Sequence, residues 1–250
     1  MSGKLYIVPT PVGNLEDMSP RAIATLSKSD LILCEDTRTS AVLLRHFGIN
    51  VPTESHHKFN EHTAVQPVIR RLESGMTISL ISDAGTPGIS DPGFMLVREC
   101  RRQGIEVETL PGPTALIPAL VNSGLPCDRF TFEGFLPQKK GRATRLAELA
   151  EEPRTFILYE SPLRLVKALS QLAENCGTDR QASVSREISK VHDTTVTGTL
   201  EQLIAYFTDN NPRGEIVIIV EGNSARAEKK VHKNKYKDTS GPESEEYPED

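Results

Sequence analysis

Short apolar runs alternate with segments of helical periodicity in the first half of the chain, and this alternation restricts the fold more than any other feature. The helical segments carry clear start and stop signals, such as Ser19 before Pro20 at one start and Gly48 at one end. Strands that alternate with helices favour right-handed βαβ units. The apolar runs predicted to be strands are "LYIVP", "DLILCE", "MTISLIS" and "IEVETL". Residues 1–115 are therefore predicted to form a mainly parallel sheet.

The second half of the chain has a different strand pattern. The segments "QASVSREI" and "TTVTGT" follow one another without a helix between them, which indicates a mixed sheet. The stretch "NSGLPCD" at residues 122–128 is the predicted linker. The predicted fold class is α/β, with one α/β domain at 1–121, a second at 122–223 and a ligand cleft between them.

The last 27 residues, 224–250, form a predicted charged tail. It is basic in "RAEKKVHKNKYK" and acidic in "DTSGPESEEYPED", with few apolar side chains. Burial in such a segment does not offset the entropy lost on ordering, so we expect it to be flexible. A solvated tail and a basic arm that contacts RNA are both compatible with this composition.

Charge and cysteine content narrow the class of protein. The net charge of -5 over 250 residues does not indicate a polyanion partner, although a local basic patch is compatible with it. The four cysteines are widely spaced and form no C-x-x-C pair, which is typical of reduced, mostly buried thiols. The sequence contains no apolar run long enough for a signal peptide or a membrane helix. A cytoplasmic location without a membrane partner is expected.

Three loops rich in glycine and proline follow predicted strands. The longest, "ISDAGTPGISDPGF" at 81–94, has three glycines and two prolines, and "PTPVGN" at 9–14 and "PGPTA" at 111–115 are similar in style. Glycine lets backbone approach a ligand closely, and open α/β sheets bind ligands at the carboxyl ends of their strands. Neither G-x-x-x-x-G-K-[ST] nor G-x-G-x-x-G is present. The loops thus predict a ligand site without specifying the ligand.

Six motifs carry a resemblance to a known family. They are "LYIVPTPVGNLEDMSPRA", "CEDTRTS", "ISDAGTPGISDPG", "LPGPTA", "YESPLR" and "GEIVIIVEG", in this order over about residues 4–222. With these motifs the chain resembles the tetrapyrrole methylase superfamily of S-adenosylmethionine-dependent methyltransferases. The loop "PTPVGN" stands where the tetrapyrrole enzymes have a G-x-G-P-G-D type loop, which favours the branch that methylates RNA. The resemblance implies a homodimer that methylates the ribose 2'-hydroxyl of a cytidine in the decoding region of 16S rRNA, in the small ribosomal subunit.

The resemblance also implies where the cofactor binds. In this superfamily S-adenosylmethionine lies folded in the cleft between the domains, held mostly by backbone groups. Asp83, which opens the long loop, is either a cofactor contact or a residue that caps and orients that loop. The positions implied to bind the cofactor are Pro11, Asp83, Gly85, Thr86, Pro87, Ile89, Thr114, Ala115 and Glu160.

The motif "CEDTR" supplies candidates for catalysis. Methyl transfer to a hydroxyl needs a group that accepts the proton of the nucleophile. Asp36 and Glu35 are the predicted catalytic carboxylates, because they leave the second strand at its carboxyl end. Arg38 is predicted to hold a phosphate of the substrate. The alternative for this motif is structural, with Asp36 and Thr37 in an ion pair or a helix N-cap.

Two polar segments are predicted to contact RNA. The segment "ESHHKFNEH" at 54–62 is predicted to be a mobile loop over the cleft, with His57 as a substrate contact or base. No metal is expected there, because neighbouring histidines point apart and the resemblance implies none. In "PQKKGR", the residues Lys139, Lys140 and Arg142 are predicted to contact RNA phosphates. A plain solvated surface is the alternative for both segments.

Two other functions remain compatible with the sequence. One is a small-molecule C-methyltransferase that acts on a tetrapyrrole, which the "PTPVGN" and "EDTR" motifs disfavour. The other is an RNA-binding module that keeps the cofactor loops without turnover. Members of the RNA branch commonly continue past the catalytic core with a small helical segment, and the charged tail stands in that position here.

Overall fold

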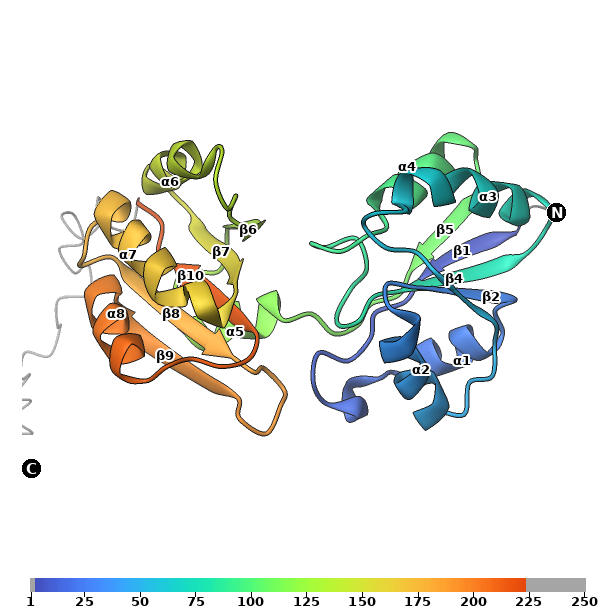
Figure 1. Cartoon of the computed structure of the whole chain (residues 1–250), viewed down its shortest axis with the longest axis horizontal. Helices are drawn as coiled ribbons and strands as arrows, with labels where there is room; N and C mark the ends of the chain where they lie inside the picture. Colours follow the sequence, from blue (N-terminus) through green and yellow to red (C-terminus); the bar gives the residue numbers. More distant parts are fainter. Residues whose placement is uncertain (1–2, 224–250) are drawn as a thin grey trace, which may run out of the picture.

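Two five-stranded sheets organise the computed structural model, which describes residues 3–223 (Figure 1). They lie side by side as two domains joined through loop 110–115, which follows the last strand of the first sheet (Figure 1). The predicted tail at 224–250 lies outside the described residues. None of the helices in residues 3–223 is long and apolar enough to cross a membrane.

The first sheet is parallel and has the strand order β3-β2-β4-β1-β5. Its strands are β1 (Lys4–Ile7), β2 (Leu31–Cys34), β3 (Thr53–Ser55), β4 (Thr77–Ile81) and β5 (Glu106–Thr109). Its helices are α1 (Pro20–Ser27), α2 (Thr37–His46), α3 (Glu61–Glu73) and α4 (Phe94–Arg102), with a short 3-10 helix at Leu15–Asp17. The predicted parallel sheet is confirmed. The short strand β3 was not predicted, because its three residues are all exposed and include no apolar side chain.

Helices cover both faces of this sheet because its strands are apolar at successive positions. In β2, Leu31 and Leu33 face α3 and α4, while Ile32 and Cys34 face α1 and α2. All four of these side chains are buried. A strand that is buried on both faces is typical of a parallel sheet between helical layers. The side chain of Ser19 accepts a hydrogen bond from the Ala22 amide and starts α1 where the sequence predicted.

The second sheet is mixed and has the order β6-β7-β10-β8-β9. Strands β6 and β7 are parallel, and the pairs β7–β10, β10–β8 and β8–β9 are antiparallel, which confirms the prediction. The strands are β6 (Phe130–Phe135), β7 (Thr155–Glu160), β8 (Gln181–Arg186), β9 (Thr194–Thr199) and β10 (Ile216–Val220). The helices are α5 (Leu116–Ser123), α6 (Arg142–Ala150), α7 (Leu165–Cys176) and α8 (Leu200–Asp209), with a 3-10 turn at Pro162–Arg164.

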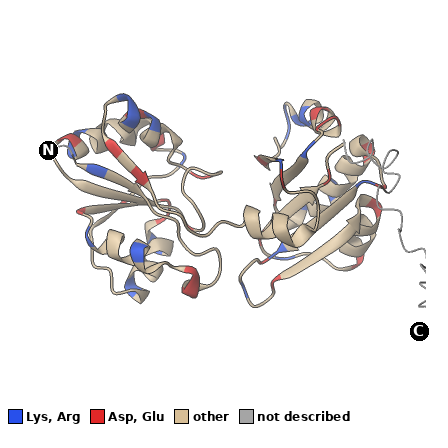
Figure 2. Ribbon diagram, turned by 180° about the vertical axis from the view of Figure 1, so that it is seen from behind, with Lys and Arg blue, Asp and Glu red and all other residues tan. Residues whose placement is uncertain are grey.

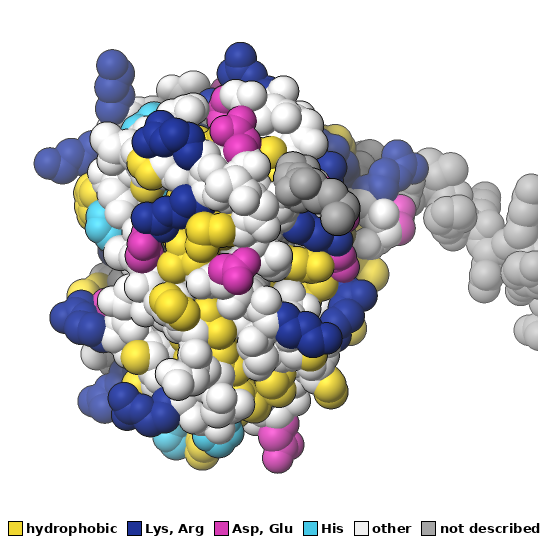
Figure 3. Space-filling model, turned by 90° about the vertical axis from the view of Figure 1, so that its right-hand side faces the viewer, with side chains coloured by type: hydrophobic (Ala, Val, Ile, Leu, Met, Phe, Trp, Pro, Cys, Tyr) yellow, Lys and Arg dark blue, Asp and Glu magenta, His cyan; other side chains and the backbone are white. Residues whose placement is uncertain are grey.

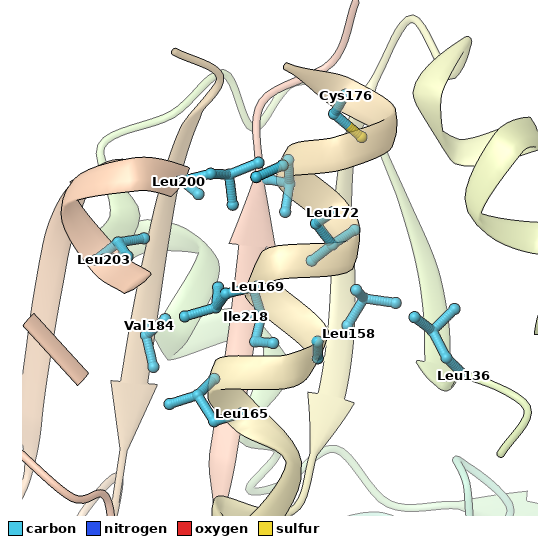
Figure 4. Close-up of a cluster of buried hydrophobic side chains, with 14 of the residues drawn as sticks. Leu136, Leu158, Leu165, Leu169, Leu172, Cys176, Val184, Leu200, Leu203 and Ile218 are labelled. Carbon is cyan, nitrogen blue, oxygen red and sulfur yellow. The ribbon is translucent and has the colours of Figure 1, made fainter. Parts of the chain in front are cut away.

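The main core of this domain lies under α6, α7 and α8. Leu165, Leu169 and Leu172 of α7 point from one face of that helix onto β7, β10 and β8 (Figure 4). At roughly 1.5–3 kcal/mol for each fully buried side chain of this size, this contact is a major contribution to the stability of the domain.

Helix α5 packs on the opposite face of the second sheet. Its buried residues Ala119 and Leu120 contact Ile157, Val217 and Ile219. The boundary predicted between residues 121 and 122 therefore falls inside α5, which belongs to the second domain. The chain changes sheets earlier, in loop 110–115, because the apolar stripe of α5 is buried against the second sheet.

Candidate active site

The three glycine- and proline-rich loops meet at the carboxyl ends of three adjacent strands. They follow β4, β1 and β5, which are neighbours in the sheet. Thr10 and Gly85 exchange two backbone hydrogen bonds of 2.9 Å, and the Thr86 hydroxyl donates to the Pro113 carbonyl at 3.1 Å. The loops therefore support one another and form a single surface.

The loop after β4 needs unusual backbone angles. Gly85 has a φ of +77°, which glycine adopts without the penalty of a Cβ atom. Ser90 has a φ of +66°, which is uncommon for a residue other than glycine. A residue held in this region is a reason to look for function nearby. Ser90 directly precedes Asp91, so this turn determines where the Asp91 carboxylate lies.

Glu61 fastens the far end of the same loop. Its Oε1 accepts hydrogen bonds from the amides of Gly93 at 3.0 Å and Met95 at 3.1 Å. These amides belong to the start of α4, whose N-cap Gly93 offers no side chain. One residue of the predicted polar loop 54–62 thus has a structural role as a remote helix cap.

Glu61→Ala is expected to lower the free energy of unfolding by about 1–2 kcal/mol, because two amides at the start of α4 lose their acceptor. His62→Ala, a change at the exposed neighbouring position, is the control and should leave stability nearly unchanged. Urea unfolding followed by circular dichroism measures both. Equal stabilities of the two variants would contradict the capping role.

A cavity of about 430 Å³ lies between the two domains. The first domain contributes residues that follow four strands, β1, β2, β4 and β5. The second contributes residues that include Phe135, Tyr159, Ile188 and the start of β10. Tyr159 packs edge-on against Phe135 with ring centroids 5.7 Å apart. The predicted cleft is therefore present, with polar loops on one wall and mainly apolar and aromatic side chains on the other.

Most of the residues predicted to bind the cofactor line this cavity. Pro11 and Pro87 do not line it and are buried in the loops behind its wall. The lining residues from the predicted set are Asp83, Gly85, Thr86, Ile89, Thr114, Ala115 and Glu160. Their role as cofactor contacts stays a prediction.

Carboxylates dominate the charge of the cavity. Among the described residues, its lining contains five carboxylates and no Lys, Arg or His. Two of the five are paired: Glu160 with Arg164 at 2.7 Å, and Glu215 with Lys190 at 3.1 Å. No cation within residues 3–223 forms a salt bridge with the other three, and these are Glu35, Asp83 and Asp91. The site therefore favours a cationic ligand and disfavours a phosphate.

Three of these carboxyl groups have raised pKa values, and burial is the main cause for Asp83, as it is for the other two. Burial, reinforced by the nearby Glu35 charge, raises the pKa of Asp91 to about 7. Burial and the neighbouring Asp83 carboxylate also raise the pKa of Glu35. A carboxylate that titrates near neutral pH is suited to accept and release a proton.

Asp36 lies in a different environment from these groups. It is the N-cap of α2, and its Oδ1 accepts a hydrogen bond of 2.8 Å from the Arg38 amide. Its carboxylate also forms a salt bridge of 2.7 Å with the Arg38 side chain, which lowers the pKa of Asp36 to about 2. Neither residue lines the cavity. The structural alternative stated for this motif matches this geometry, and a carboxylate of such low pKa is a weak proton acceptor.

The residues predicted to contact RNA lie outside the cavity lining. The His57 Nδ1 accepts hydrogen bonds of 3.2 Å from the amides of Phe59 and Asn60, so this ring orders its own loop. Lys139 and Lys140 are exposed. Arg142 is largely buried, and its Nε donates to Gln171 at 2.9 Å.

Sequence reasoning missed several residues of the cavity. Asp91 stands in the quoted loop, but its value as a titrating group depends on burial that appears only in the folded structure. Tyr159 precedes the predicted Glu160, and its aromatic ring was the available signal. Ile188 comes from a loop without a recognisable pattern, and residues 214–217 belong to the quoted motif "GEIVIIVEG", whose apolar run predicts a strand but not a place in the cavity wall.

Comparison with known proteins defines the family. The model of the tetrapyrrole (corrin/porphyrin) methylases matches residues 4–204. A ribosomal RNA small subunit methyltransferase I from Synechocystis sp. is 51% identical over 221 residues, which cover 88% of this chain and 79% of that protein. The chain belongs to the tetrapyrrole methylase family, in the branch of ribosomal RNA small subunit methyltransferase I. As a member of this family it is a methyltransferase.

Other relatives agree with this placement. The proteins of the same name from Xylella fastidiosa and Escherichia coli O157:H7 are 51% and 47% identical, with 82% and 80% of their lengths covered. Among solved structures, the fold is similar to uroporphyrin-III-C-methyltransferase from Thermus thermophilus, with a TM-score of 0.62. It is also similar to cobalt precorrin-4 methyltransferase, with a TM-score of 0.65. These two structures are each 18% identical and cover 91% and 87% of this chain, so they support the tetrapyrrole methylase fold alone.

Proposed function

We propose that this methyltransferase transfers the methyl group of S-adenosylmethionine to the ribose 2'-hydroxyl of a cytidine in the decoding region of 16S rRNA. The observation that carries the proposal is the 51% identity with a relative named for the small ribosomal subunit RNA. The similarity to tetrapyrrole enzymes is limited to the fold at 18% identity. The RNA substrate is therefore preferred over a tetrapyrrole.

We place S-adenosylmethionine in the cavity between the domains. The molecule carries a sulfonium and an ammonium group against one carboxylate, so it is a net cation and suits the acidic lining formed by Glu35, Asp83 and Asp91. The backbone of Gly85 and Thr86 is open to close approach, as the resemblance to the family implies. Apolar side chains such as Ile89 and Val217 offer contacts for the adenine ring.

When bound, the cofactor supplies an electrophilic methyl group on sulfur. Held beside Gly85 and Thr114, it would supply this methyl group to the ribose oxygen, and the electron pair of the carbon–sulfur bond would stay on sulfur. The hydroxyl proton leaves the nucleophile, and we assign its acceptor to Asp91. Glu35, predicted as a catalytic carboxylate, lies beside this group in the lining, and its charge adds to the burial that raises the pKa of Asp91. Exclusion of water between the domains and positioning of the hydroxyl supply much of the remaining rate enhancement.

Label transfer from S-adenosylmethionine tests this function. Purified protein is incubated with the methyl-labelled cofactor and either 30S subunits that lack the modification, naked 16S rRNA or uroporphyrinogen. We expect label in 16S rRNA, resistant to alkaline cleavage at one position because a 2'-O-methyl group blocks that cleavage. Mass spectrometry of nuclease digests then places the methyl group on a cytidine ribose.

The three substrates separate the competing functions. Label in uroporphyrinogen would support the tetrapyrrole alternative. Cofactor binding without label in any substrate would support an RNA-binding module without turnover. The homodimer implied by the resemblance also stays a proposal, and sedimentation equilibrium of the purified protein measures it.

A further inference from the structure

A second hollow lies on the outer surface of the second domain, between α6 and α7. Its volume is about 410 Å³, close to that of the cavity between the domains. In contrast to that cavity, it is lined by four cations and a single carboxylate, Glu174. The four cations are Lys139, Arg142, Arg164 and Lys167.

Because the cavity between the domains is acidic, an RNA substrate needs a basic surface elsewhere on the protein. An RNA substrate brings phosphates on both sides of its target ribose, and the three unpaired carboxylates of the cavity repel them. The net charge of -5 gives no general attraction either. The end of the molecule formed by the first domain shows Lys and Arg side chains separated by apolar and uncharged ones (Figure 3). The affinity for RNA must therefore come from local cations near the cavity.

The hollow and the cavity lie at the same edge of the second sheet. Strand β6 ends at Phe135, which lines the cavity, and Gln138 and Lys139 line the hollow just beyond it. Basic residues mark the loop that leads into α6 (Figure 2). The hollow is thus only a few residues along the protein chain from Phe135. An extended RNA strand that leaves the cavity at Phe135 therefore reaches the hollow.

Glu160 connects the two sites directly. Its carboxylate is buried in the cavity wall and lies 2.7 Å from Arg164 and 3.9 Å from Arg142, which both line the hollow. The two arginines thus neutralise a carboxylate of the cavity from behind. Lys139 and Lys167 have no salt bridge within residues 3–223, and both are exposed. These two ammonium groups remain available for a ligand.

We propose that the hollow between α6 and α7 binds backbone phosphates of the RNA that flank the target ribose, with Lys139 and Lys167 as the contacts. Arg142 and Arg164 hold the wall that separates the phosphates from the cofactor. The proposal rests on the proposed RNA substrate. It adds Lys167 to the predicted phosphate contacts and gives Arg142 and Arg164 a supporting position.

The double variant Lys139→Ala/Lys167→Ala tests the site. RNA affinity is measured by fluorescence anisotropy with a labelled single-stranded 16S fragment between about 50 and 300 mM salt. The slope of log affinity against log salt should decrease by about 1.4 units, since each contact to single-stranded RNA contributes about 0.7. Affinity at about 0.1 M salt should fall roughly tenfold or more. S-adenosylmethionine affinity, measured by calorimetry, should stay unchanged.

The matched control is Lys28→Ala/Arg70→Ala, which removes two exposed cations at the ends of α1 and α3, away from the second domain. Its salt slope should equal that of the wild type. Equal slopes for the two double variants, with a wild type that methylates RNA, would overturn the hollow and leave the proposed function intact. A wild type that neither binds nor methylates RNA would overturn both. Tight binding of inorganic phosphate alone would overturn the assignment to an RNA backbone.

Discussion

Asp91→Asn is expected to reduce the turnover of RNA methylation by a factor of about 100 or more, because general-base catalysis contributes on this scale. The amide keeps the size of the carboxyl group but accepts no proton. In the wild type, turnover should fall as the pH decreases through about 7, where Asp91 becomes protonated. The variant should lack this acid limb. Single-turnover rates between about pH 5.5 and 9, with cofactor and RNA above saturation, measure both effects.

A stability measurement separates this role from a structural one. The folded pKa of Asp91 lies above its unfolded value, so the unfolded state binds fewer protons between about pH 4 and 7 and stability falls as the pH rises through that window. Asn does not ionise and removes this loss. Asp91→Asn should therefore have a melting temperature at pH 8 equal to or above that of the wild type. Loss of turnover together with loss of stability would indicate a structural role.

Two neighbouring variants are the controls. Burial is the main cause of the raised pKa of Asp91, and Glu35→Gln removes the charge that adds to it, so the acid limb should move to lower pH while most of the turnover remains. Asp36→Asn should keep near-normal turnover, since the Asp36 carboxylate is bound to Arg38. Complete inactivity of Glu35→Gln would identify Glu35 as the proton acceptor. Strong loss of turnover in Asp36→Asn would return that role to Asp36.

Gly85→Val is expected to abolish S-adenosylmethionine binding in calorimetry. Gly85 has a φ of +77°, and the first atom of a side chain there would lie 3.6 Å from Val12 and 3.9 Å from the Pro113 carbonyl. A branched side chain would extend from this point into the junction of the three loops. The backbone penalty alone is about 1–2 kcal/mol, so the variant should still fold.

Gly104→Val is a matched control for this change. Gly104 has a similar φ of +70°, but no atom lies within 4 Å of its added Cβ, and it sits in the turn before β5. It should show the same backbone penalty with unchanged cofactor affinity. If a folded Gly85→Val variant binds the cofactor normally, the ligand does not contact this loop.

Local patterns predicted the fold well because each strand carries its own apolar run. Residues 216–220, for example, are five consecutive apolar side chains that are all buried. The partner of a helix is less accessible from sequence. Helix α5 follows a strand of the first sheet, and its apolar stripe does not specify which sheet will cover it. Its burial against Ile157 and Val217 results from contacts distant in sequence.

The parts of the site that depend on backbone conformation could be predicted from the sequence. The parts that depend on the burial of a side chain were less predictable. Gly85 is recognisable in the sequence, since a positive φ favours glycine. Asp36 and Asp91 both stand in polar loops next to charged or capping residues, and the sequence does not distinguish them. The structure places a cation beside Asp36 and burial around Asp91, which moves their pKa values in opposite directions.

Loop 110–115 has a mechanical consequence. It is the last segment of the first domain, it lines the cavity between the domains at Thr114 and Ala115, and it leads into the first helix of the second domain. The hydrogen bond from Thr86 to Pro113 anchors it to the loop after β4. Any rotation of one domain against the other must change dihedral angles in this segment, since the hinge of a domain motion lies in the residues that connect the domains. The residues that would change their dihedral angles in a domain rotation thus also form part of the binding surface. A molecule bound in the cavity therefore restricts the rotation of one domain against the other.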